Sequence, residues 1–304
     1  MSNAYLRFWG VRGSYSAPFD THLQVGGNTS CVEIRAGDSI LVCDAGTGII
    51  PLGNELIKQT KLREMLIILT HYHWDHICGL PFFVPAFLPD WKLHFFGPGQ
   101  SGADIKEFVS AQMRAPYFPV GTETWLAQVD YMNPPENHEI NYGPINVTYS
   151  SVHHPGTTYG YRIKLNGKEI LYISDNECLY LNKAIRLKYG EFNKEEQELY
   201  DAMQKEEYDS ELKLIQGSDI LIHDAQYTKE DYDKKRGWGH SCYIDTVNTA
   251  IDAGVKELYL YHHDPNYDDG TIDGIYRHCL QIIKDRSSDL KCHIAREGDQ
   301  IDLS

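Results

Sequence analysis

Short hydrophobic runs, many of them rich in β-branched and aromatic side chains, recur along the first half of the chain between glycine-rich turns. Runs of this length and composition are typical of strands that are buried or half-buried in a sheet. Two stretches with helical character, Gly48–Gln59 and Ala103–Met113, form the first connections. The pattern predicts strands at Tyr5–Trp9, Cys31–Ala36, Ile40–Asp44, Met65–Leu69, Lys92–Phe96, Ile145–Val152, Tyr159–Leu165 and Glu169–Ile173.

Strands and helices alternate in the last third of the chain. Strands are expected at Ile220–His223 and Glu257–Tyr261, with helices at about Tyr243–Ala253 and Thr271–Lys284. The last of these helices has one apolar face, formed by Ile272, Ile275, Cys279, Ile282 and Ile283. Antiparallel-looking strands mixed with flanking helices indicate an α/β layered sandwich.

One segment differs from the rest in charge. Between Glu191 and Glu211 nine acidic residues stand against two lysines, a local net charge of −7. A thin apolar stripe favours a solvated amphipathic helix, although a lid or a dimer arm would share the pattern; the stripe comprises Leu199, Met203, Leu212 and Ile215. We therefore predict one domain over residues 1–304, with an acidic helical insertion near residues 178–216, and expect a homodimer.

Composition narrows the class of protein. The 304 residues contain 28 Lys and Arg against 43 Asp and Glu, a net charge of −15. This balance disfavours a protein that grips long nucleic acid or a membrane, although a local positive site could still hold a small anion. The seven cysteines are scattered and contain no CxxC pair, which is typical of reduced thiols in a cytoplasmic protein. The start lacks signal-peptide character, and prolines interrupt the most apolar window, Ile77–Pro89, so no membrane segment is expected.

The most informative feature is a histidine-rich motif directly after the run Met65–Leu69. It contains His71, His73, Asp75 and His76 within six residues. Neutral imidazoles and carboxylates are the ligands that Zn and neighbouring metals prefer. His71 and His73 can point one way while the turn swings Asp75 and His76 towards a second point. One loop can therefore serve two metal ions.

A closed site for two ions needs ligands from other segments, and three segments at strand ends offer them. These are Val152-His153-His154-Pro155-Gly156, then Ile173-Ser174-Asp175-Asn176, and finally Leu260-Tyr261-His262-His263-Asp264. Each signal is weak alone, but loops that follow strands can converge at one edge of a sheet. The residues alone leave open which histidine of each doublet is the ligand.

The motif HxHxDH, present as His71, His73, Asp75 and His76, resembles the hallmark of the metallo-β-lactamase-fold hydrolases. The resemblance implies a four-layer αββα sandwich that binds two divalent ions, with Zn favoured by the nitrogen and oxygen ligands and Mn or Fe compatible. It further implies roles for four other residues: Asp44 braces the ligand loop, His154 is a ligand, Asp175 bridges the ions, and His262 completes the second ion's ligands.

A second pair points towards phosphodiesters. Asp224, in His223-Asp224-Ala225-Gln226, and His240, in Gly239-His240-Ser241, resemble a pair found in transfer-RNA 3′-processing enzymes and cyclic phosphodiesterases of this fold. By that resemblance Asp224 orients His240, and His240 protonates the departing alkoxide. A surface histidine before a serine helix cap is the alternative. Retention of Asp75, expected to be both ligand and catalytic, and of His76 argues against antibiotic hydrolysis.

The resemblance also limits the substrate. The transfer-RNA processors of this fold carry a long arm between the third and fourth motifs, whereas His154 and Asp175 are only 21 positions apart in the chain. We therefore expect a small substrate such as a cyclic-nucleotide-like phosphodiester, attacked by a hydroxide that bridges the ions, with no long nucleic acid as partner. Asn28, Thr29 and His263 are the expected substrate contacts. The alternatives are a thioester or lactone hydrolase on the same site and a non-catalytic binding module.

Overall fold

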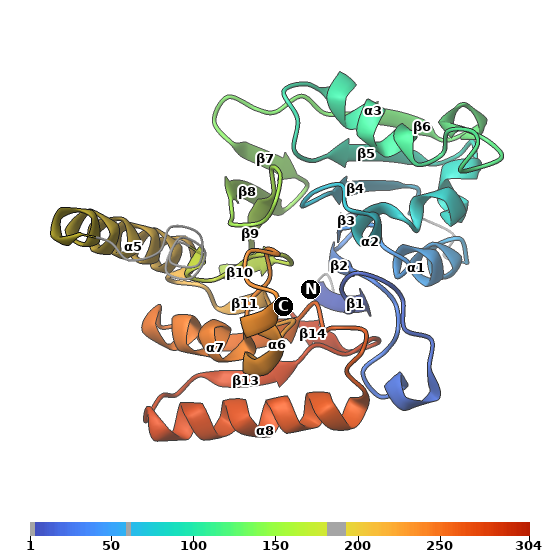
Figure 1. The fold of residues 1–304 in the computed structure, drawn as a ribbon. Coiled ribbons are helices and arrows are strands. Elements are labelled where there is room, and N and C mark those ends of the chain that lie inside the picture. Colours follow the sequence, from blue (N-terminus) through green and yellow to red (C-terminus); the bar gives the residue numbers. More distant parts are fainter. Residues whose placement is uncertain (1–3, 59–61, 181–192) are drawn as a thin grey trace.

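Two seven-stranded sheets face each other in the computed structural model, which describes residues 4–58, 62–180 and 193–304 (Figure 1). The first sheet has, in spatial order, β14 (Gln300–Asp302), β1 (Ala4–Gly10), β2 (Cys31–Ala36), β3 (Ser39–Cys43), β4 (Glu64–Ile68), β5 (Lys92–Phe96) and β6 (Gln128–Tyr131). The second has β13 (Lys291–Ile294), β12 (Glu257–Tyr261), β11 (Ile220–Asp224), β10 (Lys168–Ile173), β9 (Tyr159–Leu165), β8 (Ile145–Ser151) and β7 (Glu139–Tyr142).

Helices cover the outer faces of both sheets (Figure 1). In β4, Leu66 and Ile68 face the second sheet, while Met65 and Ile67 pack with the helices on the outer face. Burial on both faces explains why this strand is a continuous hydrophobic run. The predicted αββα sandwich is confirmed.

The described helices are α1 (Ile49–Leu56), α2 (Trp74–Ile77), α3 (Gly102–Ala111), α5 (Lys194–Ile215), α6 (Lys229–Lys234), α7 (Tyr243–Asp252) and α8 (Asp269–Asp285). The 3-10 turns are η1 (Asp20–His22), η2 (Leu80–Phe82), η3 (Val84–Phe87) and η4 (Thr122–Thr124).

Helix α5 lies in the stretch expected to be an acidic insertion and extends away from the two sheets (Figure 1). It begins with a capping box in which Asn193 and Glu196 bond each other's backbone N–H groups. Of the expected apolar stripe, Leu199 is 64% exposed whereas Ile215 is buried. The other buried residues of the helix are Tyr200, Glu207 and Glu211. Residues 181–192 of the same stretch lie outside the described residues. None of the described helices is long and apolar enough to span a membrane.

The carboxyl ends of several strands lie at one edge of the sandwich, where the loops that follow them come together. Strands β3 and β4 are parallel neighbours in the first sheet, and β10, β11 and β12 are parallel neighbours in the second. Parallel strands direct their following loops to the same edge. The segments that follow β3, β4, β10, β11 and β12 therefore meet, and they carry most of the residues singled out from the sequence.

Candidate metal centre

The HxHxDH motif forms a sharp turn after β4. His71 and His73 lie in the irregular segment between β4 and α2, where His73 has extended backbone and flanks the helix, and Asp75 and His76 lie in the single turn of α2. The change from strand to helix sends the two pairs of side chains in different directions, as the spacing predicted. All of these side chains except His73 are buried.

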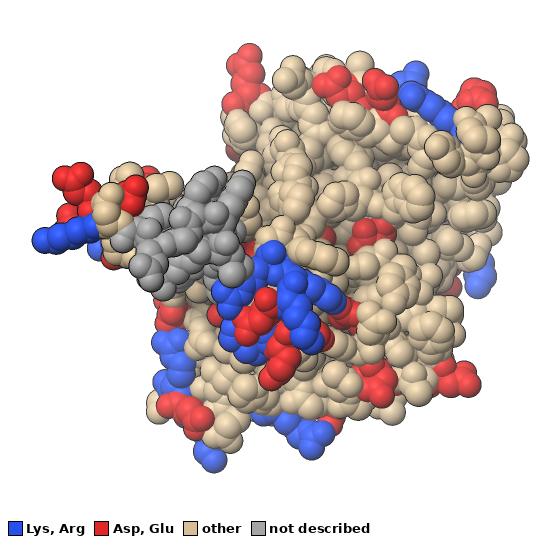
Figure 2. Space-filling view, in the orientation of Figure 1, with Lys and Arg blue, Asp and Glu red and all other residues tan. Residues whose placement is uncertain are grey.

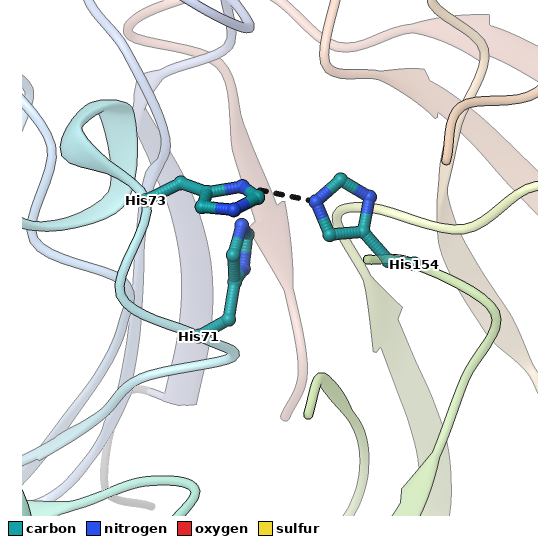
Figure 3. Close-up of side chains that lie close together, drawn as sticks. All are labelled: His71, His73 and His154. Atoms are coloured by element: carbon teal, nitrogen blue, oxygen red, sulfur yellow. Dashed lines mark hydrogen bonds between the residues drawn. The ribbon is translucent and has the colours of Figure 1, made fainter. Parts of the chain in front are cut away.

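The structure brings three other predicted segments to this turn. His154 Nε2 lies 3.0 Å from His73 Nδ1, and the rings of His71, His73 and His154 face one another (Figure 3). Three groups are made of predicted ligands alone, and in each of them all the ligand atoms lie within 4.8 Å of one another; a further group combines His154 and Asp175 with His240. The first three groups are His71, His73 and His154; His71, His76 and Asp175; and Asp75, His76 and His262.

Asp175 lies between the groups, and its two oxygens face opposite sides. Oδ1 is 3.1 Å from His76 Nε2 and 3.4 Å from His262 Nε2. Oδ2 is 3.8 Å from both His71 Nε2 and His154 Nε2. A carboxylate so placed can contact one ion with each oxygen.

Four of the imidazoles are oriented by oxygens of the surrounding protein. The Nδ1 atoms of His71, His76, His154 and His262 lie 2.8–3.1 Å from Thr70 Oγ1, Asp44 Oδ2, the Gly239 carbonyl and Gln226 Oε1, respectively. Metal-bound histidines are held in this way, with the other ring nitrogen left for the ion. The Nε2 atoms of all four are directed at the cluster.

The charges in the cluster fit divalent cations. The carboxylates of Asp44, Asp75, Asp175 and Asp224 are all buried, and within the described ranges no Lys or Arg pairs with any of them. His71 Nε2, His76 Nε2 and Asp175 Oδ1 have no hydrogen-bond partner, although the last two are 3.1 Å apart. Buried charges and polar atoms without partners are costly, and bound cations would satisfy both.

Burial and the nearby carboxylates shift the pKa values of the ligand histidines. Burial opposes charge on His76, but the carboxylates of Asp175, Asp75 and Asp44 outweigh it and raise its pKa well above the ordinary value. In contrast, burial lowers the pKa of His154 to about 4. His154 therefore offers a neutral ring nitrogen at neutral pH, whereas His76 must release a proton when it accepts an ion.

The two histidine doublets are resolved by the direction of their side chains. His154 and His262 point into the cluster. His153 is instead 45% exposed in its side chain and lies 3.3 Å from Glu207. His263 turns the other way, with Nε2 3.2 Å from the Ala295 carbonyl. The structure thus places the residues chosen by resemblance in the cluster.

Asp224 and His240 also meet at the cluster. His240 Nδ1 is 2.8 Å from Asp224 Oδ2 and 3.8 Å from Asp175 Oδ2. The His240 ring stacks on His262 at 5.0 Å between ring centroids and is only partly buried. A histidine so held keeps its remaining nitrogen available to a group bound beside the cluster.

Asp44 contacts several residues that carry or hold the ligands. It accepts hydrogen bonds from the backbone and hydroxyl of Thr70 and from Tyr172, and it faces His76 Nδ1. Its backbone has a φ of 61°, and that of His262 is 58°. Such conformations cost energy in non-glycine residues and persist where the surrounding structure fixes them. Both residues lie where strands end at the cluster.

The expected substrate contacts have other partners. Asn28 Nδ2 donates to Glu297 Oε2, and Thr29 Oγ1 accepts a hydrogen bond from the backbone of Thr47. Thr29 and His263 are buried. All three side chains have hydrogen-bond partners within the protein, and their role as substrate contacts stays a prediction.

Sequence reasoning assigned no role to two groups that contact the ligands. The backbone N–H of Ser14 donates to Asp75 Oδ2 at 2.6 Å, and Gln226 Oε1 orients His262 while Gln226 Nε2 donates to Ser14 Oγ. Gln226 stands in the segment quoted for Asp224, but nothing in that segment alone shows which side chain it meets. These contacts join the N-terminal loop to the second group of ligands.

A further cluster lies behind Asp175 and needs no ion. Cys178, Glu211 and His223 are buried, with their ligand atoms within 4.8 Å. The side-chain amide of Asn176 donates to Glu211 Oε1 at 3.0 Å and lies 3.4 Å from His223 Nε2. Hydrogen bonding therefore accounts for this cluster, which anchors the C-terminal part of α5 beside the site.

Gly13→Ala is expected to disturb the second group of ligands. A Cβ at Gly13 would lie 2.3 Å from His262 Cε1, so either the ring or the loop must move. We expect reduced metal content, measured by elemental analysis of the purified protein. Gly274→Ala is the matched control, because a Cβ there meets nothing within 4 Å on an exposed helix face. Wild-type metal content in G13A would contradict the placement of His262.

The chain is similar in sequence to known proteins. Residues 40–193, just over half of the chain, match the β-lactamase superfamily domain. A ribonuclease Z of Picrophilus torridus is 23% identical over 289 residues, covering 87% of each chain. A ribonuclease Z of Methanocaldococcus jannaschii is 27% identical over 276 residues, covering 81% of this chain and 83% of that protein.

Solved structures show the same fold. The metallo-β-lactamase-fold protein YhfI of Bacillus subtilis superposes with a TM-score of 0.65 at 19% identity, covering 99% of both chains. The short form of human tRNase Z gives 0.60 at 18% identity, again covering 99% of both. A diphosphatase of the PhnP family gives 0.60 at 16% identity, covering 99% of this chain and 98% of that one.

Proposed function

The chain belongs to the β-lactamase superfamily and is a metal-dependent hydrolase, and from this premise we propose that it is a phosphodiesterase acting on small, cyclic-nucleotide-like diesters. The observation that carries the proposal is the Asp224–His240 pair beside the cluster. An alkoxide is a poor leaving group at neutral pH, so an alkyl diester needs a proton donor, whereas a thioester releases a thiolate, which leaves more readily without one.

We assign His71, His73 and His154 to one ion, Asp75, His76 and His262 to the other, and Asp175 to both. Two divalent ions, when bound, supply Lewis acidity towards a phosphoryl oxygen and a nucleophilic water at neutral pH. The nitrogen and oxygen ligands favour Zn. Zinc, a cytoplasmic location and a homodimer stay predictions of the sequence.

The remaining steps belong to the chain's own residues. Asp224 holds His240 by Nδ1, which fixes the ring and leaves Nε2 facing away from Asp224. Nε2 of His240 then gives its proton to the departing alkoxide oxygen. Asp44 and Thr70 keep His76 and His71 in the orientation that leaves their Nε2 atoms for the ions. The burial of the cluster limits the access of bulk water.

The distribution of charge supports a small substrate. On the face shown in Figure 2, Lys and Arg gather mainly in one patch over α6, where Asp and Glu are interleaved with them. Proteins that hold long nucleic acids neutralise many phosphates along a track, and this mixed patch is a poor match for one. The name ribonuclease Z borne by the relatives makes RNA the competing substrate in any test.

A substrate panel tests the proposal. Cyclic nucleotides, an aryl phosphodiester, a short RNA with a 3′ extension, a thioester and a lactone are assayed with Zn and with Mn. We expect turnover of the diesters, with the cyclic nucleotides preferred to RNA. Turnover of the thioester or lactone alone would refute the phosphodiesterase assignment, and preference for RNA would refute the small-substrate assignment.

A further inference from the structure

A glutamate with no role in metal binding lies two residues after Asp175. Glu177 is fully buried, and its carboxylate accepts hydrogen bonds from the backbone N–H of Gly237, the backbone N–H of Gly239 and the hydroxyl of Tyr232. The distances are 3.0 Å to each amide nitrogen and 2.7 Å to the hydroxyl. Within the described parts of the chain, no Lys or Arg forms an ion pair with it. Hydrogen bonds from backbone amides to a buried carboxylate are strong and directional.

The loop that Glu177 holds carries both parts of the proposed chemistry. Gly239 presents its carbonyl to His154 Nδ1 at 2.8 Å, which determines which nitrogen of His154 faces the ions. His240 is the next residue along the chain. Gly239 has a φ of +89°, and a Cβ there would lie 2.2 Å from Pro155, so the loop passes too close to the His154 segment for any other residue.

Backbone N–H groups at and beside Glu177 also bond to the His154 loop and to the segments that carry Asp224 and His240. Its backbone N–H donates to the carbonyl of His153 at 2.7 Å. On either side of it, the backbone N–H groups of Asn176 and Cys178 donate to Asp224 Oδ2 and to Ser241 Oγ. The segment that carries Asp175 is therefore fastened to both the His154 loop and the His240 loop.

We infer that Glu177 is a positioning residue that sets the placement of His240 and the orientation of His154 through the amides of Gly237 and Gly239. The expected effect of Glu177 on the rate rests on the proposed function. The expected effect on the orientation of His154 does not, because that orientation can be observed without turnover.

Glu177→Gln is the sharpest substitution. The glutamine has the same size, but one carboxylate oxygen becomes an NH2 group, which cannot accept a hydrogen bond from a backbone N–H. At least one contact to the glycine loop is then replaced by two opposed donors. A displacement of about 1 Å at a catalytic group can cost about 100-fold in rate, so we expect kcat on an alkyl-leaving diester to fall by about 10- to 100-fold.

The experiment compares leaving groups in the metal-loaded protein. E177Q should lose about 10- to 100-fold on the alkyl diester and much less on an activated aryl diester, with KM nearly unchanged. Glu33→Gln is the matched control: Glu33 is a buried glutamate in β2 that accepts hydrogen bonds from Tyr5, Trp9 and Arg35. E33Q should lower stability without changing the ratio of the two rates.

A second readout needs no substrate. In metal-free protein labelled with 15N-histidine, the wild type should show His154 protonated at Nδ1, in a hydrogen bond to Gly239. E177Q should shift or broaden that signal, and E33Q should not. An unchanged His154 signal together with equal rate losses on both diesters would overturn the inference. If the wild type hydrolysed neither diester, the proposed function would fail, and the His154 signal would still decide the role of Glu177.

Discussion

Asp175→Asn is expected to abolish most hydrolysis of every substrate and to remove at least one metal ion per chain. Asp175 Oδ1 faces His76 and His262, and its Oδ2 faces His71 and His154. The amide keeps the size but loses the charge and one acceptor oxygen. Because metal ions contribute several kcal/mol to transition-state stabilisation, the rate should fall by on the order of 1,000-fold. Metal content and initial rates are measured on the same preparation.

Asp90→Asn provides the comparison for this loss. Asp90 is an exposed acid that pairs with Arg63 outside the cluster, so D90N should retain both the metal and the activity. If D175N kept a full complement of metal and near-normal rates, the assignment of Asp175 to both ions would be wrong.

His240→Ala should have an effect of similar size, and the effect should depend on the leaving group. Loss of a general acid costs about 100- to 10,000-fold where the leaving group needs a proton. An alkyl diester should suffer this loss, whereas an aryl diester should lose far less because its leaving group departs as a stable anion. The measurement is kcat for both substrates at saturating metal.

The pair of substrates provides an internal check on that prediction. His240 is close enough to Asp175 for its loss to disturb the ions as well, and a disturbance of the ions would lower both rates equally. Equal losses would therefore remove the general-acid role. His138→Ala, a change at an exposed histidine outside the cluster, should leave both rates unchanged.

The central strands of the fold could be predicted from the sequence because their burial is recorded in their composition. Runs such as Met65–Leu69 are apolar on both faces, and the structure places β4 within one residue of that prediction. The four edge strands, β6, β7, β13 and β14, were not predicted. They are three or four residues long and partly exposed, so hydrophobic periodicity carries little signal there.

The metal-binding motifs were visible in the sequence, but the direction of their side chains was not. His153 and His154 are chemically identical, and only the fold turns one towards Glu207 and the other towards Gly239. Supporting groups are harder still to predict. Ser14 acts through its backbone N–H, so its side chain gives no clue. Glu177 meets amides some 60 residues further along the chain, and no local pattern reveals that contact.

The partners of residues in turns illustrate the same limit. Asn28 stands in a glycine-rich turn that could approach a ligand, yet Glu297, from the far end of the chain, binds both its backbone and its side chain. A turn sequence indicates that the backbone can bend. It does not indicate which distant segment will take up its polar groups.

Hydrolysis of phosphodiesters at this site should require two divalent ions. To measure this requirement, chelator-stripped protein is titrated with Zn from zero to four equivalents while the initial rate of alkyl diester hydrolysis is followed. We expect no hydrolysis without metal and a rate that rises to a plateau at two equivalents per chain. Hydrolysis by the metal-free protein, or no diester hydrolysis at any loading, would contradict this expectation.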